Sequence, residues 1–230
     1  MYTYIFDKEN CWYKEKCSKY SNNECDSSCI RYMEMHYLLG TSNIPKSKQF
    51  KNELIPNKID LSNFKFLAEL KNDIVNFVNN GENLYLFSKN FGNGKTSWSI
   101  KLMQKYFDEI WAGNGFTQRG LFIHVPSFLT KFKEVMNKKD EGFEILKKQL
   151  VEVDLVIWDD IAASKLSDYD HTNLLTYIDQ RKLNGKSNIY TGNLDEEELI
   201  SAVGNRLKSR IWNDSTIVEL YGNDRRGGNN

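Results

Sequence analysis

The sequence lacks several features that would place it in other classes of protein. Its 230 residues include 31 basic and 31 acidic side chains, so the formal net charge is zero. This balance gives no overall electrostatic reason to bind nucleic acid, and any such site would have to be a local basic patch. No apolar run approaches the roughly 18 residues of a membrane-spanning helix, and the first residues lack the basic start and apolar core of a signal peptide. We therefore expect a cytoplasmic protein with no membrane partner.

Cysteine is absent after residue 29, and all four cysteines lie close together. They are Cys11, Cys17, Cys25 and Cys29. In a cytoplasmic protein such a cluster favours a metal site over disulfides, and four thiolates can close a tetrahedral zinc site. The spacing is not that of paired C-x2-C knuckles, so a site that uses His36, an iron–sulfur cluster and free buried thiols stay open as alternatives. We predict a zinc-binding module over residues 1–40 and a linker over residues 41–60.

Short apolar strands alternate with helical patterns over the rest of the chain. The predicted strands cover residues 84–87, 120–125, 153–158, 187–191 and 215–220. Apolar residues at helical spacing lie between them, and one further helix over residues 61–80 precedes them. This alternation indicates an α/β fold with a parallel sheet covered by helices on both faces. We predict that residues 61–230 form this domain.

The most specific motif lies between the first strand and the next helix. Residues 84–100 contain a strand, a Phe-Gly-Asn-Gly turn, a Lys-Thr pair and a helix, which is the order of a P-loop. In such a loop the backbone N–H groups and the helix N-terminus bind phosphates, and the lysine reaches the terminal ones. The predicted nucleotide-binding residues are Gly92, Asn93, Gly94, Lys95, Thr96 and Ser97. The consensus has a glycine where this chain has Lys89, so a chance glycine-rich turn is the alternative.

Polar residues follow two of the later strands. Asp159 and Asp160 come directly after the strand over 153–158, and Asn193 follows the next strand. Because the carboxyl ends of parallel strands share one edge of the sheet, we expect Asp159 beside the P-loop, where it and Thr96 would hold Mg²⁺. Asp160 would polarise an attacking water, and Asn193 would orient that water or contact the γ-phosphate. Ordinary strand-ending turns are the alternative explanation.

Two arginines, Arg206 and Arg210, lie four residues apart and would share one face of a helix. A solvated basic helix is the usual explanation for such a run. The alternative is an arginine that reaches the nucleotide of a neighbouring subunit.

Together these motifs resemble the AAA+ ATPases, and more narrowly the DnaC/DnaI-type replicative helicase loaders and their phage-encoded relatives. The resemblance covers about residues 64–226. It rests on the P-loop, the Asp-Asp pair, the Thr-Gly-Asn sensor, the Arg-x-x-Ser-Arg-Ile segment and the cysteine cluster. It implies an AAA+ core with a five-stranded parallel sheet. Because few residues follow Arg210, we expect no C-terminal lid domain, and Arg225 or Arg226 would have to replace the arginine that a lid supplies.

The resemblance implies an ATPase that loads a replicative hexameric helicase onto single-stranded DNA and acts as a switch in a homo-oligomer. Arg210 would complete a neighbour's site and Arg206 would lie at the subunit interface. ATP, Mg²⁺ and Zn²⁺ are the implied cofactors, and the location is the cytoplasm of a bacterium or of a phage-infected host. Lys131 and Lys133 are candidate DNA contacts, with an ordinary solvated helix face as the alternative for each. Many AAA+ proteins have glutamate at the position of Asp160, so hydrolysis is expected to be slow and stimulated by assembly or DNA.

Three other functions stay open. A transposase-helper ATPase of the IstB type shares this core. A small-molecule P-loop kinase would need an acceptor pocket, and it would leave Arg206, Arg210 and the cysteine cluster without roles. A non-hydrolysing adaptor would explain why Lys89 and Asp160 depart from the residues that ATP-hydrolysing members have at these positions.

Overall fold

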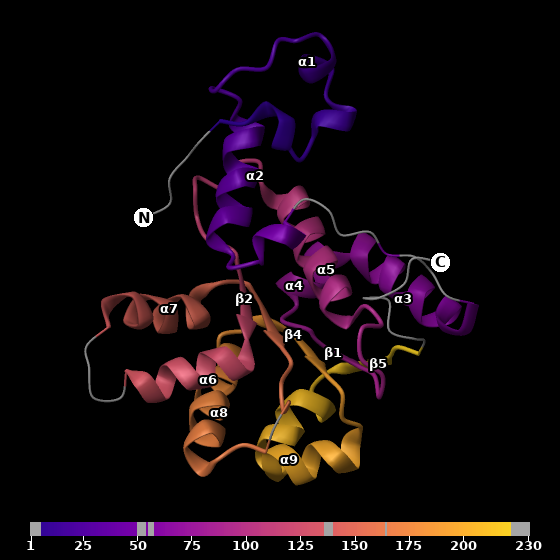
Figure 1. The fold of residues 1–230 in the computed structure, drawn as a ribbon, viewed down its shortest axis with the longest axis vertical. Helices are drawn as coiled ribbons and strands as arrows, with labels where there is room; N and C mark the ends of the chain where they lie inside the picture. The colour runs from indigo at the N-terminus through magenta and orange to yellow at the C-terminus, as the bar shows by residue number, and fades with distance from the viewer. Residues whose placement is uncertain (1–5, 50–53, 55–57, 136–139, 164, 222–230) are drawn as a thin grey trace.

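A five-stranded parallel sheet forms the centre of the molecule (Figure 1). The computed structural model describes residues 6–49, 54, 58–135, 140–163 and 165–221. The strands are β1 (Asn83–Phe87), β2 (Gly120–His124), β3 (Leu155–Asp159), β4 (Ser187–Gly192) and β5 (Thr216–Glu219). Their order is β2-β3-β4-β1-β5, and every neighbouring pair is parallel. The predicted parallel sheet is confirmed, and its carboxyl ends share one edge.

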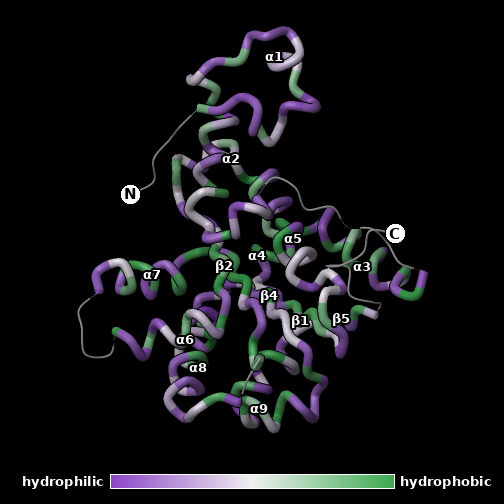
Figure 2. The backbone as a smooth tube through the Cα atoms, viewed as in Figure 1, coloured by the Kyte–Doolittle hydropathy of each residue, from purple (hydrophilic) through white to green (hydrophobic). Residues whose placement is uncertain are grey.

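Helices cover both faces of this sheet. The larger helices are α2 (Ile30–Thr41), α3 (Leu61–Asn72), α4 (Ile74–Asn79), α5 (Lys95–Ile110), α6 (Val125–Glu134), α7 (Glu141–Glu152), α8 (Asp168–Leu183) and α9 (Glu196–Lys208). Side chains alternate along each strand, so Leu84 and Leu86 join the core with α2 to α5, whereas Tyr85 and Phe87 join the core with α6 to α9. Hydrophobic residues concentrate along the sheet (Figure 2).

The predicted helix over residues 61–80 is two helices. The chain turns at Asp73, between α3 and α4, and Asp73 N–H still bonds back to Glu69 and Leu70. Apolar spacing predicted the buried face of both helices but not the break between them. Asp73 interrupts the helix, whereas the apolar residues keep their helical spacing on both sides of it.

The segment that carries the two arginines also differs from the prediction. Helix α9 kinks at Gly204, whose φ is 73° and ψ is 165°. A short π-helical turn, Ser209–Asn213, follows it directly. Arg206 lies in α9 and Arg210 in this turn, both beyond the kink, so their sharing of one helical face stays a prediction. Gly204 permits the kink because it has no Cβ.

Part of the predicted linker packs against the core. The backbone N–H of Phe122 in β2 donates to Ser42 O at 2.7 Å, and Ile44 is buried in the core. Gln104 of α5 donates from Nε2 to Lys48 O and to Gln49 O, both at 2.9 Å. Residues 42–49 therefore form a strap across β2 and α5. Residues 50–53 and 55–57 of the predicted linker lie outside the described residues.

The cysteine segment lies at the far end of α2 from the sheet (Figure 1). It consists of short turns and the four-residue helix α1 (Ser18–Ser21). The Arg31 guanidinium lies 3.6 Å from the ring centroid of Tyr13 and 5.4 Å from that of Trp111, just beyond α5. These cation–π contacts attach the segment to the core. In the described part of the chain, no helix is long and apolar enough to cross a membrane.

Candidate nucleotide-binding site

The loop between β1 and α5 has the backbone geometry of a phosphate-binding turn. Gly92 and Gly94 have φ angles of 69° and 103°, in the region where a side chain is strained. Gly94 is the N-cap of α5, and its carbonyl accepts a hydrogen bond from Trp98 N–H at 2.8 Å. The first turn of α5 thus presents its backbone N–H groups to the loop, where the helix dipole favours an anion.

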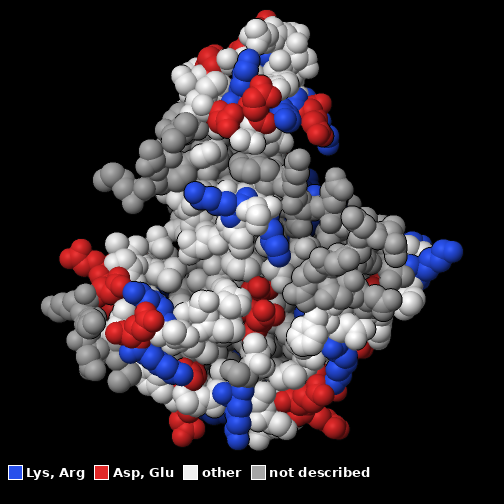
Figure 3. Space-filling view, viewed as in Figure 1, with Lys and Arg blue, Asp and Glu red and all other residues white. Residues whose placement is uncertain are grey.

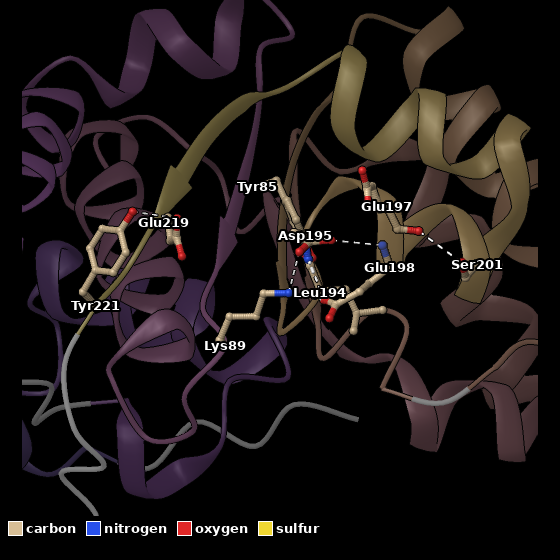
Figure 4. A network of polar contacts seen from close by, with 9 residues as sticks. All are labelled: Tyr85, Lys89, Leu194, Asp195, Glu197, Glu198, Ser201, Glu219 and Tyr221. Atoms are coloured by element: carbon tan, nitrogen blue, oxygen red, sulfur yellow. Dashed lines mark hydrogen bonds and ion pairs between the residues drawn. The ribbon is translucent and has the colours of Figure 1, made fainter.

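Lys89 takes the place of the first consensus glycine without backbone strain. It is not among the non-glycine residues with positive φ in the described chain, so this turn does not use the freedom of glycine at that position. Its ammonium donates to Asp195 Oδ2 and to Glu198 Oε2, at 2.5 Å each (Figure 4). Asp195 and Glu198 form the capping box of α9. Lys89 therefore joins the P-loop to the start of α9.

A cavity of about 410 Å³ opens at the carboxyl edge of the sheet, against the P-loop. It is lined by residues 91–97 of the loop and α5, residues 160–163 after β3, residues 192–194 after β4, and Lys48 of the strap. The structure thus brings the predicted loop residues, Gly92 to Ser97, together with Asp160 and Asn193. Asn193 Oδ1 is buried at this edge and has no hydrogen-bond partner among the described residues.

Lys95 and Asn93 have different tasks in the loop. The Lys95 ammonium donates to Asn90 O at 3.2 Å and to Asn93 Oδ1 at 3.4 Å. Both contacts are long enough to be exchanged for phosphate oxygens. Asn93 is buried and donates from Nδ2 to Leu220 O at 2.8 Å. Its side chain therefore anchors the loop to the end of β5.

Asp159 joins three elements through one buried carboxylate. Its Oδ1 accepts hydrogen bonds from Thr96 Oγ1 and from Thr191 Oγ1, both at 2.8 Å. Burial raises the pKa of the Asp159 carboxyl, against the opposing influence of the bonds from Thr191 and Thr96, while the neighbouring Asp160 raises it further. The carboxylate and the Thr96 hydroxyl are hard oxygen donors, a set that fits Mg²⁺.

Asp160 is held in place by its backbone and by two neighbours. Its φ is 56°, a strained value for a residue with a Cβ. Its N–H donates to Thr191 Oγ1 at 3.0 Å. His124 at the end of β2 places Nε2 at 3.7 Å from Asp160 Oδ2 and pairs through Nδ1 with Ser127 Oγ at 2.8 Å. Held by these contacts, Asp160 lines the cavity.

Sequence reasoning missed three residues of this site: Thr191, His124 and Lys48. Thr191 ends a predicted strand and His124 is the last residue but one of another, so the shared edge of a parallel sheet was a usable signal for both. Lys48 carried no such signal, because it lies in the segment predicted as a linker.

Neither Arg206 nor Arg210 lines the cavity beside the P-loop. Arg210 Nε bonds to Asp179 Oδ1 at 2.5 Å, and its Nη1 lies 3.7 Å from Asp214 Oδ2. Arg206 is exposed on α9. The predicted lid substitutes, Arg225 and Arg226, lie outside the described residues.

The two lysines predicted to contact DNA are neutralised by carboxylates. Lys131 pairs with Asp140 and Lys133 with Asp170, each at 2.8 Å. Basic and acidic side chains are mixed over the described part of the face in Figure 3. These pairs favour the alternative reading of Lys131 and Lys133 as ordinary surface residues.

All four cysteines border one small cavity, whereas His36 does not line it. Burial is the main cause of a raised pKa at the Cys11 thiol, and the other three cysteines add to it. His36 instead stacks on Tyr32, with ring centroids 5.3 Å apart. As placed, no group of three or more His, Cys, Asp or Glu side chains in the described chain could hold a metal ion. The thiols gather in one place without closing a tetrahedral site.

The fold is that of the AAA+ ATPases, in the form found in the DnaC/DnaI-type helicase loaders. The structure of the DnaC helicase loader matches with a TM-score of 0.64 and 18% identity, over 77% of this chain and 100% of that one. DnaI matches with 0.63 and 14% identity, over 78% and 96%. The replication initiator DnaA bound to AMPPCP and single-stranded DNA matches with 0.57 and 16% identity, over 73% and 48%. No family model matches the sequence, and no curated protein does.

The raised pKa of Asp159 predicts that its carboxylate lowers the free energy of unfolding of the metal-free protein at neutral pH. The folded state binds a proton here more tightly than the unfolded chain, so the contribution to stability is present at low pH and is lost as pH rises through the folded-state pKa. At pH 7 in EDTA, we expect Asp159→Asn to raise the free energy of unfolding. This gain should shrink below about pH 4, the ordinary value for aspartate. Urea titrations at both pH values measure it, and a variant less stable than wild type at pH 7 would contradict it.

Proposed function

We propose that this chain is an ATP-dependent loader of a replicative helicase onto single-stranded DNA, acting in the cytoplasm as a switch within a homo-oligomer. The observation that carries the proposal is the Asp159 carboxylate, which joins Thr96 of the P-loop to Thr191 beside Asn193. That arrangement surrounds one cavity with phosphate-binding, metal-holding and water-orienting groups. It lies on the fold of proteins named as helicase loaders.

Each residue would have a defined task when ATP is bound. The N–H groups of the loop and of the first turn of α5 would hold the phosphates. Lys95 would exchange its contacts with Asn90 and Asn93 for oxygens of the terminal phosphates. Thr96 and Asp159 would hold Mg²⁺, which would neutralise charge that develops on the phosphates.

The attacking water would be handled by residues at the sheet edge. Asp160 would accept its proton and Asn193 would orient it. His124 would keep Asp160 aligned. The DnaA structure bound to AMPPCP and single-stranded DNA supports nucleotide and DNA as ligands of such a core. Because aspartate is one methylene shorter than glutamate, we expect slow turnover that assembly or DNA stimulates.

A transposase-helper ATPase is the closest alternative, because it would use the same core. Capture by a hexameric replicative helicase in the presence of ATP supports the loader. Capture by a transposase alone would overturn it. Phosphorylation of a small-molecule acceptor by the monomer would favour the kinase.

Lys95→Ala should abolish ATP binding, because the loop loses the ammonium that pairs with the terminal phosphates. Lys105→Ala is the matched control on the same helix, since Lys105 pairs with Glu109 away from the cavity. Fluorescence titration with a labelled ATP analogue measures both. Binding by Lys95→Ala equal to that of the control would refute the P-loop assignment.

Arg210→Ala should leave ATP binding by the monomer unchanged and lower hydrolysis by the assembly, by about 10³-fold where the arginine stabilises transition-state charge. Arg210 would have to leave Asp179 to act on a neighbour. Asp179→Asn, which removes the charge that holds Arg210, should therefore not reduce turnover. Mixed assemblies provide the test in trans: Arg210→Ala subunits still have a competent P-loop, and Lys95→Ala subunits still have the arginine. If the mixture never regains activity, action in trans loses its support.

We also propose that the cysteine segment binds zinc through Cys11, Cys17, Cys25 and Cys29. Their shared cavity supports this, and the thiols would have to move to complete the site. Elemental analysis of protein purified without chelator should give about one zinc per chain. Iron, or no metal, would contradict the proposal. Replacing Cys25 with serine should lower the zinc content, whereas Ser27→Ala should not.

A further inference from the structure

One basic residue of the nucleotide cavity comes from outside the ATPase core. Lys48 belongs to the short helical turn Lys46–Lys48 in the strap that precedes α3. Within the described residues, Lys48 and Lys95 are the only lysines or arginines that line the cavity. Lys46, in the same turn, is exposed and does not line it. The two lysines of the turn therefore differ in access to a bound nucleotide.

The backbone of Lys48 is fixed to the helix that begins with the P-loop lysine. Lys48 O accepts a hydrogen bond from Gln104 Nε2 at 2.9 Å, and Lys48 N–H donates to Pro45 O at 2.7 Å. Gln104 is buried in α5. Since the backbone is held and the side chain is half-buried, the ammonium is confined to the neighbourhood of the cavity.

No ion pair among the described residues involves Lys48, whereas Lys89 is held by Asp195 and Glu198, and Arg210 is held by Asp179. The charge of Lys48 acts instead on the site, where burial raises the pKa of the Asp159 carboxyl and Lys48 opposes that rise. The acids nearest the cavity, Asp159 and Asp160, add negative charge to that of any bound phosphate. A second cation beside Lys95 offsets this charge, and in a partly desolvated cavity its effect exceeds that of a surface lysine.

We propose that Lys48 is a second phosphate-binding cation of the site and that it acts on the terminal-phosphate end of a nucleoside triphosphate. This inference rests on the proposed nucleotide binding. Lys48 shares the cavity lining with Thr96 and Asp160 and acts electrostatically on Asp159, which bonds to Thr96. This position favours the terminal-phosphate end, where Thr96 and Asp159 would hold Mg²⁺. The strap directly follows α2, whose other end carries the cysteine segment. Lys48 would therefore connect the bound nucleotide to the N-terminal part of the chain.

The test compares Lys48→Met, Lys48→Arg and Lys46→Met by isothermal titration with ATP and with ADP in the presence of Mg²⁺. Lys48→Met should weaken ATP binding about tenfold, as expected for loss of one charge-assisted contact, and should weaken ADP binding less. Lys48→Arg should keep most of the ATP affinity. Lys46→Met should match wild type. Urea unfolding checks that all three variants are folded.

Several outcomes would overturn the inference. Equal ATP affinities for Lys48→Met and Lys46→Met would show that Lys48 does not contact the nucleotide. Equal weakening of ATP and ADP would place its contact away from the terminal phosphate. Failure of the proposed function is separately visible, because wild type would then not bind ATP, or Lys95→Ala would bind it as well as wild type does.

Discussion

The site depends on one buried carboxylate. Asp159 ends the strand β3, and two hydroxyl groups from neighbouring elements converge on its Oδ1. Burial alone would make this charge costly, and the bonds from Thr96 and Thr191 compensate part of that cost. The same atoms that stabilise the carboxylate without metal are those that would coordinate or surround Mg²⁺. One arrangement therefore stabilises a buried carboxylate at this edge of the sheet, and under the proposed function it would also hold the metal ion.

Much of this could be predicted from the sequence because the signals were local. The five strands followed from short apolar runs, and the edge where Asp159, Asp160 and Asn193 meet followed from parallel topology. The break at Asp73, the kink at Gly204 and the place of Lys48 could not be predicted. The break and the kink are backbone features that leave the apolar spacing unchanged, and the place of Lys48 depends on the tertiary contacts of Gln104 with the strap, which leave no periodic trace in the sequence.

The departure from the P-loop consensus also has a physical explanation. Glycine in the first position relaxes a turn, but here the turn leaves β1 without a positive φ at Lys89. The longer side chain instead bonds to the capping box of α9. Because these groups are largely exposed, their value for global stability is small. Their effect is local: they connect the loop that would hold phosphate to the helix that leads to Arg206.

The distribution of cations around the cavity suggests how an incomplete site could act as a switch. Lys89 and Arg210 are both occupied by carboxylates, and Lys95 rests on neutral oxygens of Asn90 and Asn93. A ligand can draw these side chains away from their present partners only if it binds the rearranged protein more tightly than the present arrangement. Under the proposed function a triphosphate would meet that condition, since it would recruit Lys95 and Lys48 at once. Arg210 cannot be recruited within the same chain as placed, so the occupied monomer would still lack a cation that a second subunit could supply.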